Sequence, residues 1–217
     1  MSTGRRVGWG ALCTWFVLHT VVWIGLVRFL PGDDFVEYPE LGSAGLAWVR
    51  QFVVALLVVL GLQVVVLTTT GWWRTVWVDD RPLRARWWVA LVALAVPAAS
   101  FLSAGAPSRP ADAWIGLTVT MLLVGLTEEL TFRGIVLVGA RARTGERRAL
   151  LFSSLLFGLF HLPNALLGAA PADAARQVLA TALIGTLFYV FRRVSRGLLV
   201  PVLLHAAWDW LLISTAY

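Results

Sequence analysis

Long apolar runs separated by short polar connections account for most of the chain. Seven runs can be distinguished, and they cover residues 7–30, 45–70, 87–104, 113–140, 149–168, 174–191 and 197–217. Each has about the ~20 residues that an α-helix needs to cross a bilayer, where only a helix satisfies the backbone of a single lipid-exposed segment. The pattern predicts an all-α, polytopic transmembrane helix bundle of about seven spans. No soluble domain or internal repeat interrupts it, so we expect residues 1–217 to form a single integral membrane domain.

The charges between the runs predict the orientation of this bundle. Arginines gather at the N-terminus and in the second, fourth and sixth connections, whereas the first, third and fifth are poor in arginine. By the positive-inside rule, the N-terminus is cytoplasmic and the C-terminus lies outside, in a multi-pass protein of the cell membrane. Tryptophans near the predicted interfaces, among them Trp72 and Trp73, are typical of an aromatic belt. We interpret residues 74–86 as an ordinary basic loop, with a short interfacial helix as the alternative.

Composition and cysteine usage narrow the class of protein further. Hydrophobic residues make up 59% of the chain and charged residues 14%, against about 25% charged residues in soluble domains. A net charge of +6, taken alone, is compatible with a nucleic-acid partner, but the placement of the arginines argues against one. The arginines lie in short loops without a basic patch of interleaved aromatics, so we expect the lipid bilayer and no nucleic acid. Cys13 is the single cysteine, which excludes an internal disulfide and a thiolate metal site.

Several ionisable residues interrupt the apolar runs, where charged side chains are costly and usually face a protein interior or a wet cavity. Those far from the ends of the fourth, fifth and seventh runs are Glu128, Glu129, Arg133, His161, His205 and Asp209. Counted from the arginines at the cytoplasmic ends, Glu128, His161 and Asp209 lie thirteen residues deep and His205 lies nine residues deep. At 1.5 Å per residue, this is a common level ~14–20 Å from the cytoplasmic face. We therefore expect one shared pocket. His19 is more simply explained as an interfacial or packing residue, and Gln63 by an interhelical or interfacial hydrogen bond.

Spacing within the runs separates the roles of these residues. Glu129 and Arg133 are four residues apart on one helix face, which favours an ion pair. His205 and Asp209 have the same spacing, so both can point into one cavity. Glu128 is rotated by about 100° from Glu129 and is free to meet the histidines.

Three motifs in order carry a family resemblance. E-E-x-x-x-R at 128–133, F-x-x-x-H at 157–161 and H-x-x-x-D at 205–209 resemble those of the CAAX prenyl protease and bacteriocin-processing (CPBP, or Abi) family of intramembrane endopeptidases. The three motifs and the runs that hold them cover residues 113–213, which we call the catalytic-motif core. The first three runs resemble the family only in being membrane helices. It implies hydrolysis of a peptide bond in a membrane-associated peptide or protein tail.

The resemblance also implies a role for each residue. Glu128 would be the general base that activates water, and His161 would orient that water. His205 and Asp209 would hold either a metal or the developing oxyanion. The supporting residues would be Glu129 and Arg133. A carboxylate in a low-dielectric site is a usable base, which suits this chemistry.

The metal question stays open at this point. Two imidazoles and two carboxylates, from Glu128, His161, His205 and Asp209, suit one divalent metal such as zinc, and a metal-free, glutamate-dependent protease is the alternative. The branch that cleaves prenylated proteins has Asn in place of Asp209, and an ionised Asp cannot donate a hydrogen bond to an oxyanion. Asp209 is then protonated, ligates a metal, or orients His205. A prenylated substrate is therefore left open, and Asp fits the varied bacterial members.

Two other functions use the same polar residues. The first is a non-proteolytic membrane protein for binding, immunity or scaffolding, with the cluster as its recognition site. The second is a transporter or proton relay, in which intramembrane Glu and His residues carry protons. Inverted repeats with broken helices are typical of transporters, and the sequence shows none.

Overall fold

The computed structural model of the chain describes residues 7–37, 47–84, 88–105, 108 and 110–215. These residues form an all-helical bundle, as predicted. The long helices are α1 (Trp9–Phe29), α2 (Ala47–Thr70), α4 (Trp88–Ala104), α5 (Ala111–Glu129), α7 (Glu146–Leu159), α8 (Pro171–Val194) and α9 (Leu199–Thr215). The short elements are η1 (Gly32–Asp34), α3 (Trp73–Trp77), the π-helical turn η3 (Leu130–Val136), α6 (Leu137–Arg141) and the 3₁₀ segment η4 (Leu162–Leu167).

Two of the predicted runs contain breaks that their hydrophobicity does not reveal. The fourth run consists of three consecutive helical segments, α5, η3 and α6. They are separate elements because a π-helical turn interrupts the α-helical hydrogen bonding directly after Glu129. In the fifth run the α-helix ends at Leu159, and a 3₁₀ segment with Pro163 at its start carries the chain onward. Both breaks fall next to candidate site residues, where π-bulges and helix ends are common.

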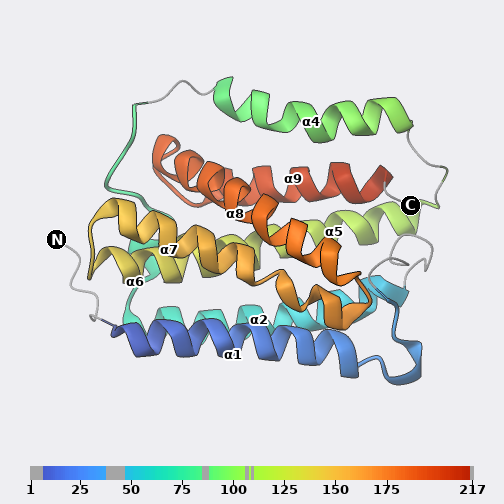
Figure 1. The fold of residues 1–217 in the computed structure, drawn as a ribbon, viewed down its shortest axis with the longest axis horizontal. Helices are drawn as coiled ribbons and strands as arrows, with labels where there is room; N and C mark the ends of the chain where they lie inside the picture. The colour runs from blue at the N-terminus through green and yellow to red at the C-terminus, as the bar shows by residue number, and fades with distance from the viewer. Residues whose placement is uncertain (1–6, 38–46, 85–87, 106–107, 109, 216–217) are drawn as a thin grey trace.

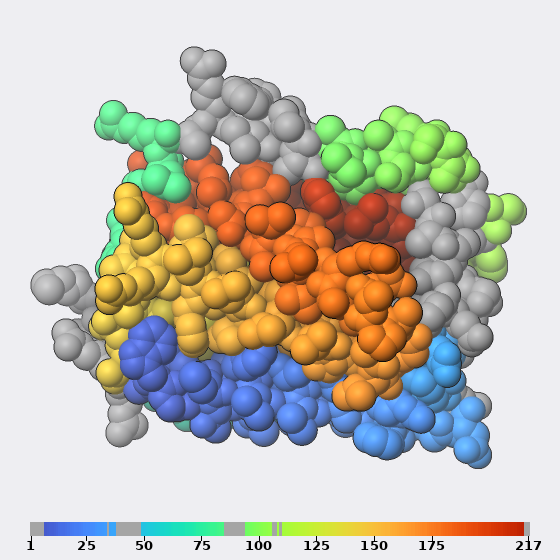
Figure 2. All heavy atoms as spheres, in the orientation of Figure 1, coloured from blue at the N-terminus to red at the C-terminus, as the bar shows by residue number. Residues whose placement is uncertain are grey.

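The helices lie side by side along the long axis of the molecule (Figure 1). Helices α1 and α2 form one edge, α5 lies in the middle, and α4 covers α9 at the opposite edge. On the face seen in Figure 2, α1, α7 and α8 lie next to one another. Helix α1 begins at one end of the bundle and α9 finishes at the other. By length and composition, four described helices are able to cross a membrane: α1, α2, α8 and the α7–η4 segment. Seven spans and the N-in orientation remain predictions.

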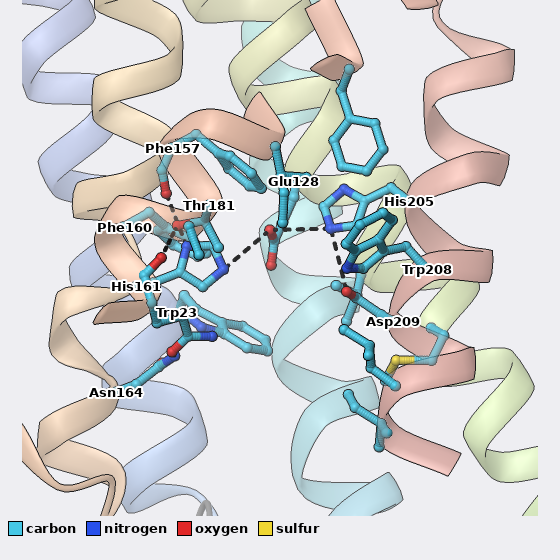
Figure 3. A pocket seen from close by; sticks show the side chains of 18 of the residues that line it. Trp23, Glu128, Phe157, Phe160, His161, Asn164, Thr181, His205, Trp208 and Asp209 are labelled. Carbon is cyan, nitrogen blue, oxygen red and sulfur yellow. Dashed lines mark hydrogen bonds and ion pairs between the residues drawn. The ribbon is translucent and has the colours of Figure 1, made fainter. Parts of the chain in front are cut away.

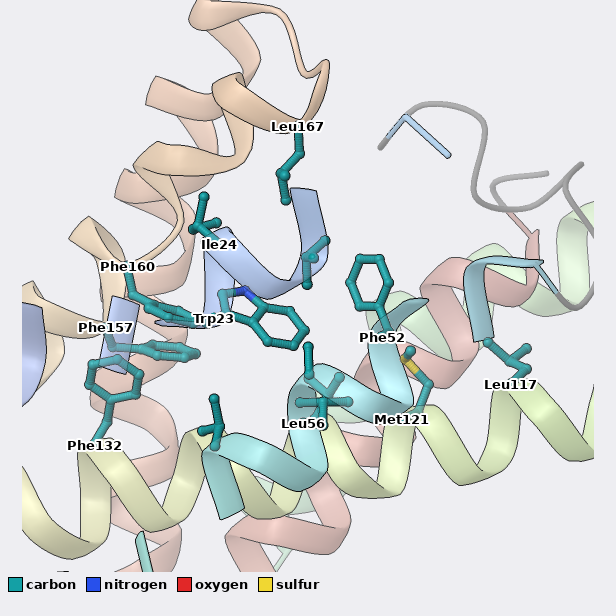
Figure 4. Packing of buried hydrophobic residues seen from close by; sticks show 14 residues of the cluster. Trp23, Ile24, Phe52, Leu56, Leu117, Met121, Phe132, Phe157, Phe160 and Leu167 are labelled. Carbon is teal, nitrogen blue, oxygen red and sulfur yellow. The ribbon is translucent and has the colours of Figure 1, made fainter. Parts of the chain in front are cut away.

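Aromatic and aliphatic side chains from α1, α2, α5, η3 and α7 form the main core (Figure 4). Trp23 packs against Phe52 at a ring distance of 5.3 Å, and Phe132 packs against both Phe157 and Phe160. His19 is buried against Phe132 and Phe160, as expected for a packing residue. This core holds α1 and α2 against the helices that carry the motifs.

The interpretation of residues 74–86 as an ordinary loop is wrong for residues 74–77, which are helical. Residues 73–77 form α3, and Val76 is fully buried at its inner side. Trp72 is 3% exposed and belongs to a buried cluster, so it is a core residue and no part of an aromatic belt. Asp79, just after α3, is buried between two arginines, 2.8 Å from Arg141 and 3.1 Å from Arg192. Burial alone lowers the pKa of Arg141, but its hydrogen bond to Asp79 and the attraction of that carboxylate raise it above its ordinary value.

Candidate active site

The two adjacent carboxylates lie at the last two positions of α5, directly before the π-helical turn. Gln63 of α2 steadies this junction, since its amide donates to the Thr127 carbonyl at 2.6 Å and to the Thr131 hydroxyl at 2.8 Å. The interhelical hydrogen bond expected of Gln63 is therefore present. It fastens the α5–η3 junction to α2 at the level of Glu128.

Glu129 and Arg133 form the ion pair that their spacing predicts. Nη1 of Arg133 lies 2.8 Å from Oε1 of Glu129, and both side chains are completely buried. The same carboxylate oxygen lies 2.9 Å from Nδ1 of His205 on α9. The guanidinium carbon of Arg133 lies 4.0 Å from the ring centre of Phe157, which adds a cation–π contact. Glu129 thus connects α5 to α9 and orients His205, a contact that spacing along the chain does not predict.

His161 lies just beyond the last turn of α7. Its Nδ1 is 2.9 Å from the Phe157 carbonyl, which only accepts hydrogen bonds, so the proton of the neutral ring is on Nδ1. Nε2 then carries the lone pair and lies 4.0 Å from Oε2 of Glu128. Phe157 also meets the imidazole edge to face, at a ring distance of 5.1 Å. The F-x-x-x-H spacing therefore fixes both the tautomer and the direction of His161.

His205 is held on three sides. Phe188 of α8 stacks on its ring at 4.8 Å and 20°, and Glu129 binds Nδ1. Nε2 lies 3.3 Å from Oδ2 of Asp209 and 3.8 Å from Oε2 of Glu128. The position of Asp209 beside Nε2 matches one of the three roles left open for it, that of orienting His205.

Polar side chains from α9 and from the end of α7 converge on Oε2 of Glu128 at the end of α5 (Figure 3). It faces Nε2 of His161 on one side and Nε2 of His205 on the other, and it has no hydrogen-bond partner among the described residues. Separations of 4.0 and 3.8 Å are too long for hydrogen bonds. They are short enough for one water molecule to contact the carboxylate and an imidazole together. The structure thus brings together Glu128, His161, His205 and Asp209.

A cavity of about 370 Å³ adjoins this cluster. Its volume lies in the range of small-molecule sites, and its wall is mostly aromatic and aliphatic with a few polar groups. The lining residues outside the motifs include Trp23, Phe52, Met121, Phe160, Asn164, Gln177, Thr181, Phe188, Trp208 and Ile213. Sequence reasoning missed the polar lining outside the motifs, which is made by Asn164, Gln177 and Thr181. The available signals were Asn164 and Gln177, amides inside the apolar fifth and sixth runs.

Glycines allow the close helix contacts that build the site. A Cβ at Gly125 of α5 would lie 2.6 Å from the Val202 carbonyl of α9. A Cβ at Gly158 of α7 would lie 2.5 Å from the Val178 carbonyl of α8, and one at Gly185 would lie 2.9 Å from the Arg133 guanidinium. These positions let α5, α7, α8 and α9 approach closely enough for their polar residues to meet.

The donor chemistry of the cluster suits a divalent metal. The Nδ1 atoms of His161 and His205 face a carbonyl and a carboxylate, which is the outer-shell arrangement that directs Nε2 lone pairs toward a metal. Carboxylate oxygens of Glu128 and Asp209 lie nearby. No three His, Cys, Asp or Glu side chains in the described part of the chain form a preformed metal-binding group. The residues fit by type, and a metal stays a hypothesis.

The fold and the site together define a helical membrane protein with a buried carboxylate–imidazole centre. The sequence profile described as Type II CAAX prenyl endopeptidase Rce1-like matches residues 110–211, which hold all three motifs. Residues 110–211 thus match a family of membrane-embedded proteases, and this match confirms the resemblance seen in the motifs. No curated protein and no solved structure shows a significant similarity to the chain.

Proposed function

We propose that the protein is an intramembrane endopeptidase that hydrolyses a peptide bond in a membrane-associated peptide or protein tail, with Glu128 activating the water. One observation carries the proposal: a buried carboxylate oxygen without a protein partner faces the Nε2 atoms of two oriented histidines. The match of residues 110–211 to a protease family supports the reaction class.

In the proposed reaction Glu128 accepts a proton from water while the water oxygen bonds to the scissile carbonyl carbon. His161, held by the Phe157 carbonyl, accepts a hydrogen bond from that water through Nε2. The carbon–nitrogen bond then breaks, and Glu128 returns its proton to the leaving amine. The products are a carboxylic acid and an amine, and Glu128 regains its starting charge state.

His205 is the proposed donor to the oxyanion. A carboxylate lies at each of its nitrogens, Glu129 at Nδ1 and Asp209 at Nε2, so the ring can carry a proton on both. The Nε2–H group then supplies the donor that an ionised Asp209 lacks. Asp209 and Glu129 act as positioning residues for His205.

A divalent metal is the other form of the same proposal. Glu128, His161, His205 and Asp209 would hold it, and it would supply Lewis-acid polarisation of the substrate carbonyl. Three carboxylates, Glu128, Glu129 and Asp209, lie near one buried arginine, which favours an additional cation in the site.

The test is cleavage of internally quenched apolar peptides by the purified protein in proteoliposomes. Glu128→Gln keeps the size of the side chain and removes its basicity, so we expect a fall in kcat of ~10²–10⁴-fold. Asp173→Asn is the matched control, because Asp173 is exposed and pairs only with the exposed Arg176 among the described residues, and it should cleave at the wild-type rate. A chelator that abolishes cleavage, with recovery on adding zinc, would assign the metal form.

Cleavage by folded Glu128→Gln at the wild-type rate would overturn the proposal. So would a wild-type protein that binds the peptides but cleaves none of them. That second result would favour the non-proteolytic binding or immunity function.

A further inference from the structure

Most residues that line the cavity lie on one side of the catalytic cluster. On α5 its lining residues besides Glu128 are Val124 and Met121, which lie toward the start of that helix. On α9 the lining continues from His205 to Ile213, toward the end of that helix. The start of α5 and the end of α9 meet at the same end of the bundle (Figure 1).

The other helices around the cavity agree with this direction. Trp23 is six residues before the end of α1, Phe52 is five residues after the start of α2, and Gln177 is six residues after the start of α8. At 1.5 Å per residue, all three lie within ~10 Å of those helix ends. The three helix ends lie at the same end of the bundle as the start of α5 (Figure 1). Asn164 lies beyond His161 on the same side (Figure 3).

The opposite side of the catalytic cluster is filled. Arg133, Phe132 and Phe157 are buried there, with Arg133 over the Phe157 ring and Ser153 donating to the Phe132 carbonyl at 2.7 Å. A peptide that approached from that side would have to separate the buried Arg133–Glu129 pair, and breaking a buried pair costs ~3–5 kcal/mol.

Farther from the cavity than the Arg133–Glu129 pair, α3 forms a second barrier, because hydrogen bonds from α8 hold it against the bundle. Arg192 of α8 is completely buried and donates to the carbonyls of Val76 and Thr75 at 2.7 and 3.0 Å. It also binds Asp79, which in turn binds Arg141 at the end of α6. The arginine-rich connections between α6 and α7 and between α8 and α9 lie at this end.

We propose that the site receives its substrate from the face of the membrane opposite the arginine-rich connections, which the positive-inside rule places outside the cytoplasm. The substrate is an apolar peptide segment presented on that face, such as a secreted peptide or the outer segment of an anchored protein. The aromatic wall of Trp23, Phe52 and Trp208 suits large apolar side chains, and the Asn164 amide suits the peptide backbone. This inference rests on the proposed peptidase function for the identity of the substrate. Its direction rests on the position of the cavity and on the orientation that the arginines predict.

Thiol labelling from one side of the membrane tests the direction without requiring catalysis. The native Cys13 is replaced by Ser, and single cysteines are placed at Thr181 or Gln177 in the cavity. Asp173→Cys, at the start of α8, and Arg147→Cys, near the start of α7, are exposed reference positions for the two faces. A membrane-impermeant maleimide is added to intact cells and, separately, to inside-out vesicles.

We expect Thr181→Cys and Gln177→Cys to be labelled from the same side as Asp173→Cys and from the side opposite to Arg147→Cys. An excess of an apolar peptide cleaved by the wild type should slow this labelling. Labelling from the same side as Arg147→Cys, or from neither side, in variants that elute as folded protein would overturn the proposal. A protein that cleaves no peptide but shows the expected labelling would refute the peptidase function and leave the direction of access standing.

Discussion

The buried ion pair between Glu129 and Arg133 gives the sharpest prediction about stability. The two atoms are 2.8 Å apart with no exposed surface on either side chain. At an effective dielectric constant of 20, their attraction amounts to ~6 kcal/mol, most of which offsets the cost of removing both charges from water. Arg133→Met fills a similar volume but leaves a buried carboxylate without its cation. We expect it to lower the free energy of unfolding by ~3–5 kcal/mol.

A double-variant cycle separates charge from packing. Arg133→Met combined with Glu129→Gln removes both charges and keeps an amide that can bind Nδ1 of His205, so most of the lost stability should return. Arg176→Met is the matched control, because its pair with Asp173 is 2.6 Å long but exposed, and it should cost no more than ~1 kcal/mol. The twelve tryptophans allow unfolding to be followed by intrinsic fluorescence in detergent with a chemical denaturant.

Two results would refute this reasoning. One is a double variant as unstable as Arg133→Met alone, which would show that packing against Phe157, and not the unpaired charge, dominates the loss. The other is an equal loss in Arg176→Met, which would mean that burial has no influence on the strength of these pairs.

Two further predictions concern positions away from the reacting groups. Gly125→Ala should lower stability by ~1–3 kcal/mol and reduce peptide cleavage, because its Cβ would lie 2.6 Å from a backbone oxygen of α9 and separate Glu128 from His205. Gly61→Ala, with open space around its Cβ inside α2, should lower neither stability nor cleavage. Equal effects of the two alanines on denaturant unfolding and cleavage would contradict this. Asp79→Asn should cost ~3–5 kcal/mol in the same unfolding assay, since it leaves the buried Arg192 without its carboxylate, and unchanged stability would show that the α3 connection is not held by charge.

The local part of the site was predictable because helical spacing is a local property. Residues four apart share a helix face, so the pairing of Glu129 with Arg133 follows from the chain alone, as does the placing of His205 and Asp209 beside one cavity. Depth along each run could also be counted from the sequence, since arginines follow the run ends that are predicted to be cytoplasmic. For that reason Glu128, His161, His205 and Asp209 were expected at one level. The structure places the other three close to the Glu128 carboxylate or to one another.

Contacts between helices depended on the tertiary structure. The hydrogen bond from His205 to Glu129, the stacking of Phe188 on His205 and the anchoring of Asp79 by Arg192 join residues 76, 17 and 113 positions apart. Neither spacing nor hydropathy encodes such pairs.

The sequence by itself determined the class of the protein, the order of its motifs and the residues that face one another within each helix, because these follow from hydrophobicity and from 3.6 residues per turn. Only the tertiary structure decided that Glu129 orients His205, that a π-helical turn follows the two carboxylates, and that the cavity extends away from the arginine-rich end. The physical reason is packing. Where a side chain points between helices depends on which neighbours fill the space around it, and here glycines at 125, 158 and 185 set how closely those neighbours approach.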